Sequence, residues 1–275
     1  MRHYGAKGRG IILLHGGPGA PGYLAPLGRK LGERFRVIEP FQRRRSHEPL
    51  TVTGHIADLA HTVEAFTIEL SASVCSPEEN RPVLLGHSWG AMLSLAYAAA
   101  HLETISAVVL IGCGTFTQAN RQLLEQTRAQ RLSPDEQQKL AEPTRAGDDP
   151  DSHYAALGRL LARADSYNLL PPTRDDDPLY CDARGGQETW ATWCLLKAQG
   201  VYPQAFNAIT VPVLMLHGDH DPHPGREIAA VLRQYVGQLE YHEFAHCGHY
   251  PWRERYARDE FFEVLTAWLT RNAGP

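Results

Sequence analysis

Residues 86–90 read GHSWG and place a serine between two glycines, directly after an apolar run. Glycine accepts a positive φ and the close approach of other backbone, so Gly86 and Gly90 would permit a sharp turn from strand to helix with Ser88 at its tip. A serine hydroxyl held at such a turn becomes a nucleophile once a neighbouring base removes its proton. The G-x-S-x-G pattern alone is weak, and its place between a predicted buried strand and a predicted helix is what favours catalysis.

A second glycine-rich turn, HGGPG at residues 15–19, follows another apolar run. Its glycines allow the backbone N–H of Gly17 to point into a cleft, where it could form an oxyanion hole with the N–H of Trp89. A tight Gly-Pro turn also occurs in many loops for structural reasons alone. Two such turns at the ends of adjacent strands, one of them carrying a serine, favour the catalytic interpretation.

Candidate acids and bases follow later in the chain, each also directly after an apolar run. The stretch LHGDHDPHP contains Asp219 and Asp221, and the stretch AHCGHYPW contains His246 and His249. The chain order Ser, Asp, His is that of one class of hydrolytic triad, in which a neutral imidazole removes the serine proton and a carboxylate fixes the imidazole. The residues alone leave two acids and two bases as candidates.

Further histidines crowd around these acids, so a metal site has to be considered; they are His217, His220, His223 and His246. None of them shows the H-x-x-x-H spacing of a helical zinc site, and turns at strand ends splay adjacent side chains apart. We therefore expect structural or solvent-facing roles for these histidines, and neither a metal nor an organic cofactor.

The overall composition indicates a folded globular chain and excludes several functional classes. Its 275 residues are 43% hydrophobic, which is enough for a sizeable core. The formal charge of -4 gives no reason to expect a nucleic acid or an anionic membrane as partner, and no apolar run has the length of a membrane span. The first ten residues, MRHYGAKGRG, lack the apolar segment of a signal peptide, so we expect a cytoplasmic protein.

The cysteines predict neither a disulfide framework nor a zinc site. They are odd in number, dispersed and free of C-x-x-C spacing: Cys75, Cys113, Cys181, Cys194 and Cys247. We expect reduced thiols, with those nearest the motifs serving as packing residues. The one basic run, Arg43 to Arg45, is expected to be a solvated loop.

The elements that must position these motifs alternate between strands and helices. Short apolar runs predict strands at 10–16, 35–40, 81–88, 107–113, 211–218 and, with the mixed polarity of a sheet edge, 239–244. Helical patterns occupy 22–33, 53–71 with Thr53 as N-cap, 89–101, 225–236 and 254–271. This alternation predicts an α/β fold with a mostly parallel, doubly wound sheet, and ligands bind beyond the carboxyl ends of such strands.

Residues 114–206 interrupt the alternation, because they contain helical patterns and no convincing buried strand. Ser133, followed by a proline and then Glu136, has the spacing of a capping box, and 188–200 reads as a helix closed by Gly200. We expect this segment to form a helical cap, or lid, over the carboxyl edge of the sheet. The core would then comprise residues 1–113 and 207–275.

The four motifs together resemble the α/β-hydrolase superfamily across nearly the whole chain. The residues that carry the resemblance are HGGPG at 15–19, GHSWG at 86–90, GDHD at 218–221 and GHYP at 248–251. The resemblance implies that Ser88 is the nucleophile, Asp221 the acid of the family's G-x-x-D and His249 the base of its G-H-x-P. It places Asp219 and His246 behind them, because neither fits its motif.

Within the superfamily, HGGPG and G-x-S-W-G most resemble the proline iminopeptidase group, which removes N-terminal residues from peptides. Lid carboxylates bind the substrate's free α-amine in that group, and the candidates here are Asp175, Asp176, Asp177, Asp182 and Glu188. This chain departs from the pattern in two places. It begins close to its first parallel strand, so the sheet should be shortened at its N-terminal edge, and FQRRRSHEP at 41–49 replaces the acidic and glycine-rich loop of many relatives.

Several functions use this machinery and stay open. The first is a serine hydrolase that acts on a small-molecule or short-peptide ester or amide through an acyl-enzyme. A carboxylesterase or thioesterase would need an apolar acyl pocket, for which the candidate walls are Trp89, Trp190, Trp193, Tyr202 and Phe206. A carbon-carbon bond hydrolase is a more distant variant, and a ligand-binding protein that keeps the fold without turnover belongs to a different class.

Overall fold

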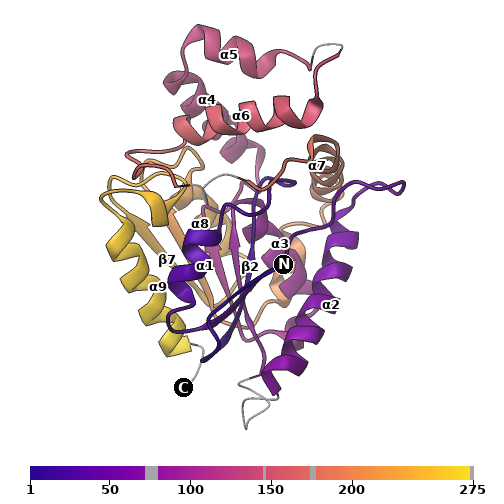
Figure 1. The fold of residues 1–275 in the computed structure, drawn as a ribbon, viewed down its shortest axis with the longest axis vertical. Coiled ribbons are helices and arrows are strands. Elements are labelled where there is room, and N and C mark those ends of the chain that lie inside the picture. The colour runs from indigo at the N-terminus through magenta and orange to yellow at the C-terminus, as the bar shows by residue number, and fades with distance from the viewer. Residues whose placement is uncertain (72–79, 145–146, 174–177, 273–275) are drawn as a thin grey trace.

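The computed structural model describes residues 1–71, 80–144, 147–173 and 178–272 (Figure 1). Within these residues seven strands form one sheet in the order β1-β3-β2-β4-β5-β6-β7. The strands are β1 (Arg2–Tyr4), β2 (Gly10–Leu14), β3 (Arg36–Glu39), β4 (Val83–His87), β5 (Ala107–Ile111), β6 (Val213–Gly218) and β7 (Leu239–Phe244). All neighbours are parallel except β1, which pairs antiparallel with β3, so the expected α/β fold is confirmed.

Helices cover both faces of this sheet, as Figure 1 shows. They are α1 (Ala25–Leu31), α2 (Val52–Ser71), α3 (Trp89–Ala100), α8 (Gly225–Leu232) and α9 (Arg258–Asn272). Alternate strand residues supply the two cores: Ile12 and Leu84 pack with α2, α3 and α8, whereas Ile11 and Leu85 pack with α1 and α9. Because successive side chains of a strand point to opposite faces, fully apolar strands are what a sheet covered on both faces requires.

The start of α2 differs from the expected one. Its N-cap is Thr51 rather than Thr53, because the Thr51 hydroxyl accepts a hydrogen bond of 3.0 Å from the N–H of Gly54. Thr51 and Thr53 have one residue between them, and the local sequence does not show which of the two caps the helix. None of the described helices is long and apolar enough to cross a membrane.

Among the described residues between β5 and β6, four α-helices form what we call the helical insert: α4 (Gln118–Arg131), α5 (Pro134–Ala141), α6 (Pro150–Ala164) and α7 (Ala183–Ala198). In Figure 1 α4, α5 and α6 stand together beyond one end of the strands. The predicted capping box is present: the Ser133 hydroxyl accepts from the N–H of Glu136, whose carboxylate accepts from the N–H of Ser133. Helix α7 ends before Gly200, at a φ of 75°, but begins at Ala183 rather than at the expected residue 188.

The thiols and surface charges of the described chain are unremarkable for a globular protein. Cys113, Cys181, Cys194 and Cys247 are free thiols, and Cys75 lies outside the described residues.

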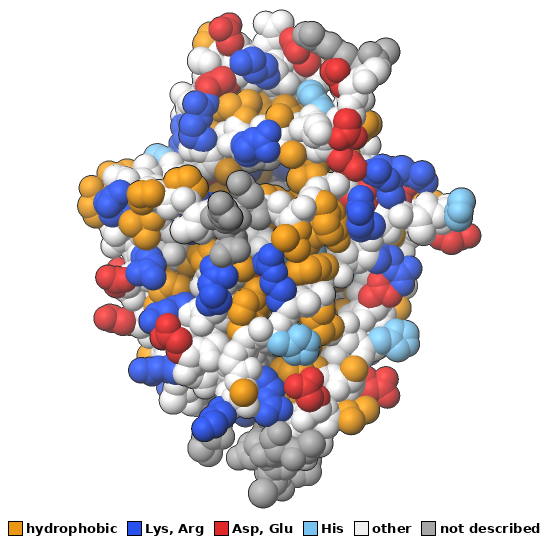
Figure 2. All heavy atoms as spheres, viewed as in Figure 1, with side chains coloured by type: hydrophobic (Ala, Val, Ile, Leu, Met, Phe, Trp, Pro, Cys, Tyr) orange, Lys and Arg blue, Asp and Glu red, His pale blue; other side chains and the backbone are white. Residues whose placement is uncertain are grey.

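Figure 2 shows acidic and basic side chains interspersed on one face, and they lie side by side where the helical insert meets the rest of the molecule. Neither acidic nor basic side chains alone cover that face.

Strand β1 was not indicated by the sequence, which predicted only a shortened edge before residue 10. The strand is three residues long, too short for a periodic pattern, and tertiary contacts hold it. The Tyr4 hydroxyl donates a hydrogen bond of 2.6 Å to the buried carboxylate of Glu39, and Arg2 lies 3.6 Å from the same oxygen. Burial raises the pKa of Glu39, although the hydroxyl of Tyr4 and the charge of Arg2 oppose that rise.

We expect Tyr4→Phe to lower the free energy of unfolding by about 1 to 3 kcal/mol, because it removes a donor from a buried carboxylate. Urea denaturation followed by circular dichroism measures the loss. Tyr235→Phe is the matched control, since the Tyr235 hydroxyl makes no hydrogen bond within the described part of the chain. An equal effect of both substitutions would contradict the role given to the contact between Tyr4 and Glu39.

Candidate active site

Ser88 occupies a strained turn between β4 and α3. Its φ is 55° and its ψ is -117°, a backbone conformation that residues other than glycine rarely adopt. A Cβ at Gly86 would lie 2.1 Å from the carbonyl oxygen of Gly90, and one at Gly90 would lie 2.1 Å from that of Leu14. Both glycines are therefore required by close backbone packing, as residues 86–90 predicted, and the packing holds Ser88 in place.

The HGGPG turn lies directly against this serine. Gly17 has a φ of 117°, and a Cβ at Gly16 would lie 2.9 Å from the Cβ of Ser88. Trp89 follows the serine as the first residue of α3, and its indole N–H donates a hydrogen bond of 2.9 Å to Gln42. The two residues proposed for the oxyanion hole, Gly17 and Trp89, thus flank the serine from different elements.

The structure joins Asp221 to His249 and leaves the competing residues apart. Nδ1 of His249 lies 2.7 Å from Oδ2 of Asp221, and both residues are buried. Asp219 is exposed and accepts from the backbone N–H of Cys247, and His246 is exposed as well. A Cβ at Gly112 would lie 2.8 Å from Nδ1 of His249, so only a glycine leaves room for the imidazole ring. The sequence did not indicate this role of Gly112.

Asp221 carries a buried negative charge among histidines. Burial would raise the pKa of its carboxyl group, but His249, His223 and His217 outweigh burial and hold that pKa well below its ordinary value. Burial would likewise lower the pKa of His249, yet the charge of Asp221 and the hydrogen bond to it raise this pKa above 6.5. Burial lowers the pKa of His223 to about 4, so His223 is neutral near pH 7.

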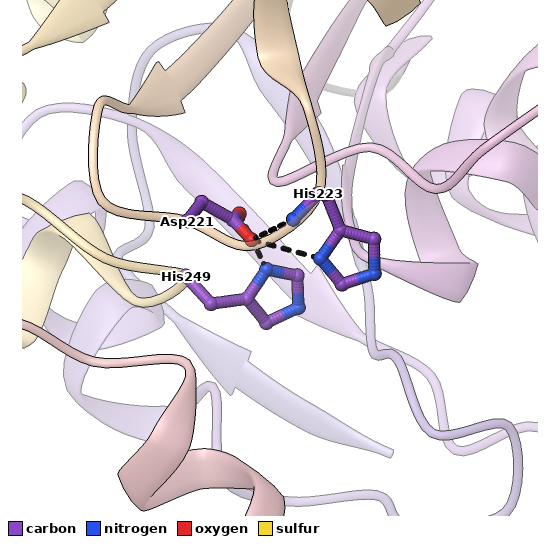
Figure 3. Close-up of side chains that lie close together, drawn as sticks. All are labelled: Asp221, His223 and His249. Carbon is purple, nitrogen blue, oxygen red and sulfur yellow. Dashed lines mark hydrogen bonds and ion pairs between the residues drawn. The ribbon is translucent and has the colours of Figure 1, made fainter. Parts of the chain in front are cut away.

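Figure 3 shows Asp221 with two imidazoles, His223 and His249, and their potential ligand atoms lie within 4.8 Å of one another. A metal ion could be considered at this spacing. Each imidazole Nδ1, however, lies at hydrogen-bond distance from its own oxygen of Asp221, 2.8 Å for His223 and 2.7 Å for His249. A metal bound at these Nδ1 atoms would have to displace both protons, so the distances are those of imidazoles hydrogen-bonded to Asp221.

A hydrogen-bond chain that the sequence did not reveal connects the three catalytic loops. His87 Nε2 lies 2.9 Å from the carbonyl oxygen of His249, so it carries the proton and Nδ1 is the acceptor. The Tyr23 hydroxyl donates to that Nδ1 over 2.6 Å and accepts from the N–H of Gly16 over 2.8 Å. Burial holds the pKa of His87 well below 6.5, in agreement with a neutral ring.

The helical insert holds the loop that carries His249. The N–H of His249 donates to the carbonyl oxygen of Asp165 over 2.9 Å. The buried carboxylate of Glu254 accepts from the N–H groups of Gly248, Tyr167 and Asn168 at 2.9, 2.8 and 2.7 Å. One carboxylate thus ties residues 167 and 168, which follow α6, to the loop of the candidate base.

The insert also holds the HGGPG turn. The Tyr154 hydroxyl, from α6, lies 2.9 Å from the carbonyl oxygens of both Gly17 and Pro18. The N–H of Asp182 donates to the carbonyl oxygen of Gly19 over 2.9 Å. The HGGPG turn and the loop of His249 are therefore both held in part by residues of the helical insert.

The expected amine-binding carboxylates have partners within the chain. Glu188 accepts from the N–H of Leu50 at 2.9 Å and from the Arg184 side chain at 2.7 Å. Asp182 caps α7 and accepts from the N–H and the side chain of Arg45. Residues 175–177 lie outside the described residues.

The expected pocket walls belong largely to the core. Trp193 is fully buried, stacked on Tyr202 with ring centroids 4.7 Å apart and edge-on to Trp89 at 5.7 Å. Trp190 is half-buried, with the guanidinium of Arg121 5.8 Å from its ring centre, and Phe206 is fully buried. A hollow of about 590 Å³ between α5 and α6 contains none of the candidate catalytic residues, so we do not place the chemistry there.

Known proteins match both the sequence and the fold. A proline iminopeptidase of Lactobacillus helveticus (strain DPC 4571) is 26% identical over 279 residues, which cover 95% of this chain and 90% of that protein. A proline iminopeptidase of Neisseria gonorrhoeae is 31% identical over 219 residues, which cover 75% of this chain and 62% of that protein. The crystal structure of a proline iminopeptidase of Mycobacterium smegmatis superimposes with a TM-score of 0.63 at 19% identity, covering 99% of this chain and 94% of that one.

These similarities confirm the resemblance that the four motifs indicated, including the closeness to proline iminopeptidases. The structural similarity, at 19% identity, concerns the fold. The sequence profile described as the alpha/beta hydrolase family matches residues 11–264, which is most of the chain. The chain therefore belongs to the alpha/beta hydrolase family.

Proposed function

We propose that this hydrolase uses Ser88 as nucleophile, His249 as general base and Asp221 as the carboxylate that orients the base. The observation that carries the proposal is the hydrogen bond of 2.7 Å between Asp221 and His249. A serine held at a positive φ follows His87, whose Nε2 donates to the carbonyl oxygen of His249. The ring of His249 lies 4.6 Å, between centroids, from that of His87, the residue before the serine. Strain at a buried strand-to-helix turn is typical of a nucleophile presented to a substrate.

In the proposed reaction, Nε2 of His249 takes the proton of Ser88 while the serine oxygen attacks the carbonyl carbon of a small ester or amide. The N–H groups of Gly17 and Trp89 stabilise the negative oxygen that forms. His249 then gives its proton to the leaving group, and the acyl-enzyme is hydrolysed by a water that His249 activates. The chemistry requires no metal or organic cofactor.

The proposed substrate class is a short peptide or small amide with a free N-terminal residue. Support comes from the relatives, which are proline iminopeptidases by name and match this chain over most of its length. The helical insert is proposed to serve as the lid over the site, because its residues contact both catalytic loops. A small ester is the second candidate, favoured by the engagement of Glu188 and Asp182 in contacts within the chain.

We expect the wild-type protein to hydrolyse prolyl-β-naphthylamide, and Ser88→Ala to lose about a thousandfold or more of that rate. The same pair of proteins is assayed separately with p-nitrophenyl butyrate. Ser106→Ala is the matched control, because Ser106 directly precedes β5, at the opposite end of the strands, and within the described residues its hydroxyl donates only to the carbonyl oxygen of Pro82. Serine-dependent turnover of the ester alone would favour an esterase, and no turnover of either substrate would favour a non-catalytic binding protein.

The rate should increase with pH through the pKa of His249, because only the neutral imidazole can accept the serine proton. Since Asp221 raises that pKa, the midpoint of the acid limb of kcat/KM should lie above pH 6.5. Asp221→Asn should move the midpoint down and lower kcat about ten-thousandfold. A rate that is independent of pH between 5 and 8 would contradict the assignment of His249.

Tyr154→Phe should lower kcat about tenfold and change KM little, because its hydroxyl fixes the turn that carries the proposed oxyanion donor Gly17. Steady-state kinetics with the better substrate of the assay above measures the effect. Tyr180→Phe is the control, since the Tyr180 hydroxyl makes no hydrogen bond in the described residues. Equal kcat and KM for the two variants would contradict the proposed role of the Tyr154 hydroxyl in holding the turn of Gly17.

A further inference from the structure

Asp221 is hydrogen-bonded to two imidazoles, although a catalytic triad needs only one. The backbone N–H of His223 donates to Oδ1 of Asp221 over 2.9 Å, and Nδ1 of the same residue lies 2.8 Å from that oxygen. His249 takes the other oxygen, Oδ2. The two oxygens of one carboxylate thus have different hydrogen-bonded imidazoles, and Nε2 of His217 lies 3.3 Å from Oδ2 as well.

The second imidazole is held firmly in this position. His223 stands between Pro222 and Pro224, whose rings restrict the backbone on both sides. Nε2 of His217 lies 3.0 Å from the carbonyl oxygen of His223 and donates to it. The ring of His223 stacks on that of His249, with centroids 4.6 Å apart and an angle of 17° between the planes.

The hydrogen bonds fix the tautomers of both rings. A carboxylate at low pKa can only accept, so His223 and His249 both carry their proton on Nδ1 and present a lone pair at Nε2. Figure 3 shows the two rings side by side, with each Nε2 on the side of its ring away from the carboxylate. His223 therefore has the same protonation as the proposed base.

We propose that His223 is a positioning residue of the proposed hydrolase. By donating to Oδ1 and stacking on the ring of His249, it stops the carboxylate from rotating and keeps Oδ2 on Nδ1 of the base. Without His223, Oδ1 would retain the backbone N–H alone, and the ring of His249 would lose the flat surface on one side. This inference rests on the proposed function of Ser88, Asp221 and His249.

Other ionisable groups face Asp221 and His249, and they bear on any pH effect. They are His87, His217, His220, Arg128, Arg131, Asp165 and Tyr250. The thiols of Cys113 and Cys247 also face Asp221 and stay neutral, because burial raises the pKa of each. Since none of these groups changes in a variant of His223, a shift of the acid limb can be assigned to the lost donor.

The test compares three variants that separate the donor from the ring. His223→Asn keeps an N–H donor near the position of Nδ1, His223→Phe keeps the flat ring without a donor, and His223→Leu keeps neither. We expect kcat to fall about 10- to 100-fold in the Leu variant with KM changed less than about threefold, and the Asn variant to recover most of the loss. The acid limb should move up by about half a pH unit or more in the Phe and Leu variants, because the carboxylate charge is then shared with fewer donors.

The rate of Ser88 labelling by a fluorophosphonate is measured alongside, since it reports the activated serine without a known substrate. If the wild type is not labelled, the proposed function fails. If the wild type is labelled and the Leu variant is labelled equally fast, or if the Asn, Phe and Leu variants have the same kinetics and pH profile, only the role of His223 fails. Should the Leu variant not fold by circular dichroism, the comparison of Asn with Phe decides.

Discussion

The carboxylate of Asp221 is a negative charge enclosed by protein, and the arrangement of the site follows from that charge. Such a charge is costly unless hydrogen-bond donors surround it. Its partners among the neighbouring side chains are imidazoles of β6 and the following loops rather than a lysine or arginine. A guanidinium in contact would have neutralised the charge permanently, whereas imidazoles leave it available to stabilise a proton on His249.

The helical insert contacts the HGGPG turn and the loop of His249, and its hydrogen bonds help to hold both. Tyr154 holds the turn of Gly17, and Glu254 binds backbone N–H groups on the insert side and on the loop of His249. These hydrogen bonds join segments far apart in the sequence. Movement of the insert would therefore alter the positions of the proposed oxyanion donors and of the proposed base together.

Sequence patterns predicted the features that depend on residues close to one another in the chain. The apolar runs located the six parallel strands, the spacing of Ser133 and Glu136 located a helix start, and Gly86 and Gly90 indicated the strained turn. Strand β1 was missed because a contact 35 residues away, from Tyr4 to Glu39, holds a segment too short to show a period.

Side-chain partners were predicted less well than elements. His223 was assigned no role in the site, and Tyr23 and Tyr154 were not considered, since each acts through a contact that only the folded chain creates. The catalytic roles of Ser88 and His249 stay predictions. Chain order and motif nevertheless chose, from two acids and two bases, the acid and base that the fold brings within 2.7 Å.

The basic run and the acidic residues of the insert, treated separately in the sequence, belong together in the fold. Arg45 pairs with Asp151 at 2.8 Å and with Asp182 at 3.1 Å. Arg43 pairs with Asp58, and the guanidinium of Arg44 lies 4.4 Å from the ring centre of Tyr180. The run lies in an exposed loop, as expected, and its guanidinium groups also have partners there.

This pairing bears on one of the two departures of the chain, the arginine-bearing loop at 41–49. A carboxylate that already has a guanidinium and backbone donors attracts a substrate ammonium group less than a free one does. The arginine-bearing loop at 41–49 thus lowers the capacity of Asp182 to bind an α-amine while it joins the insert to the core.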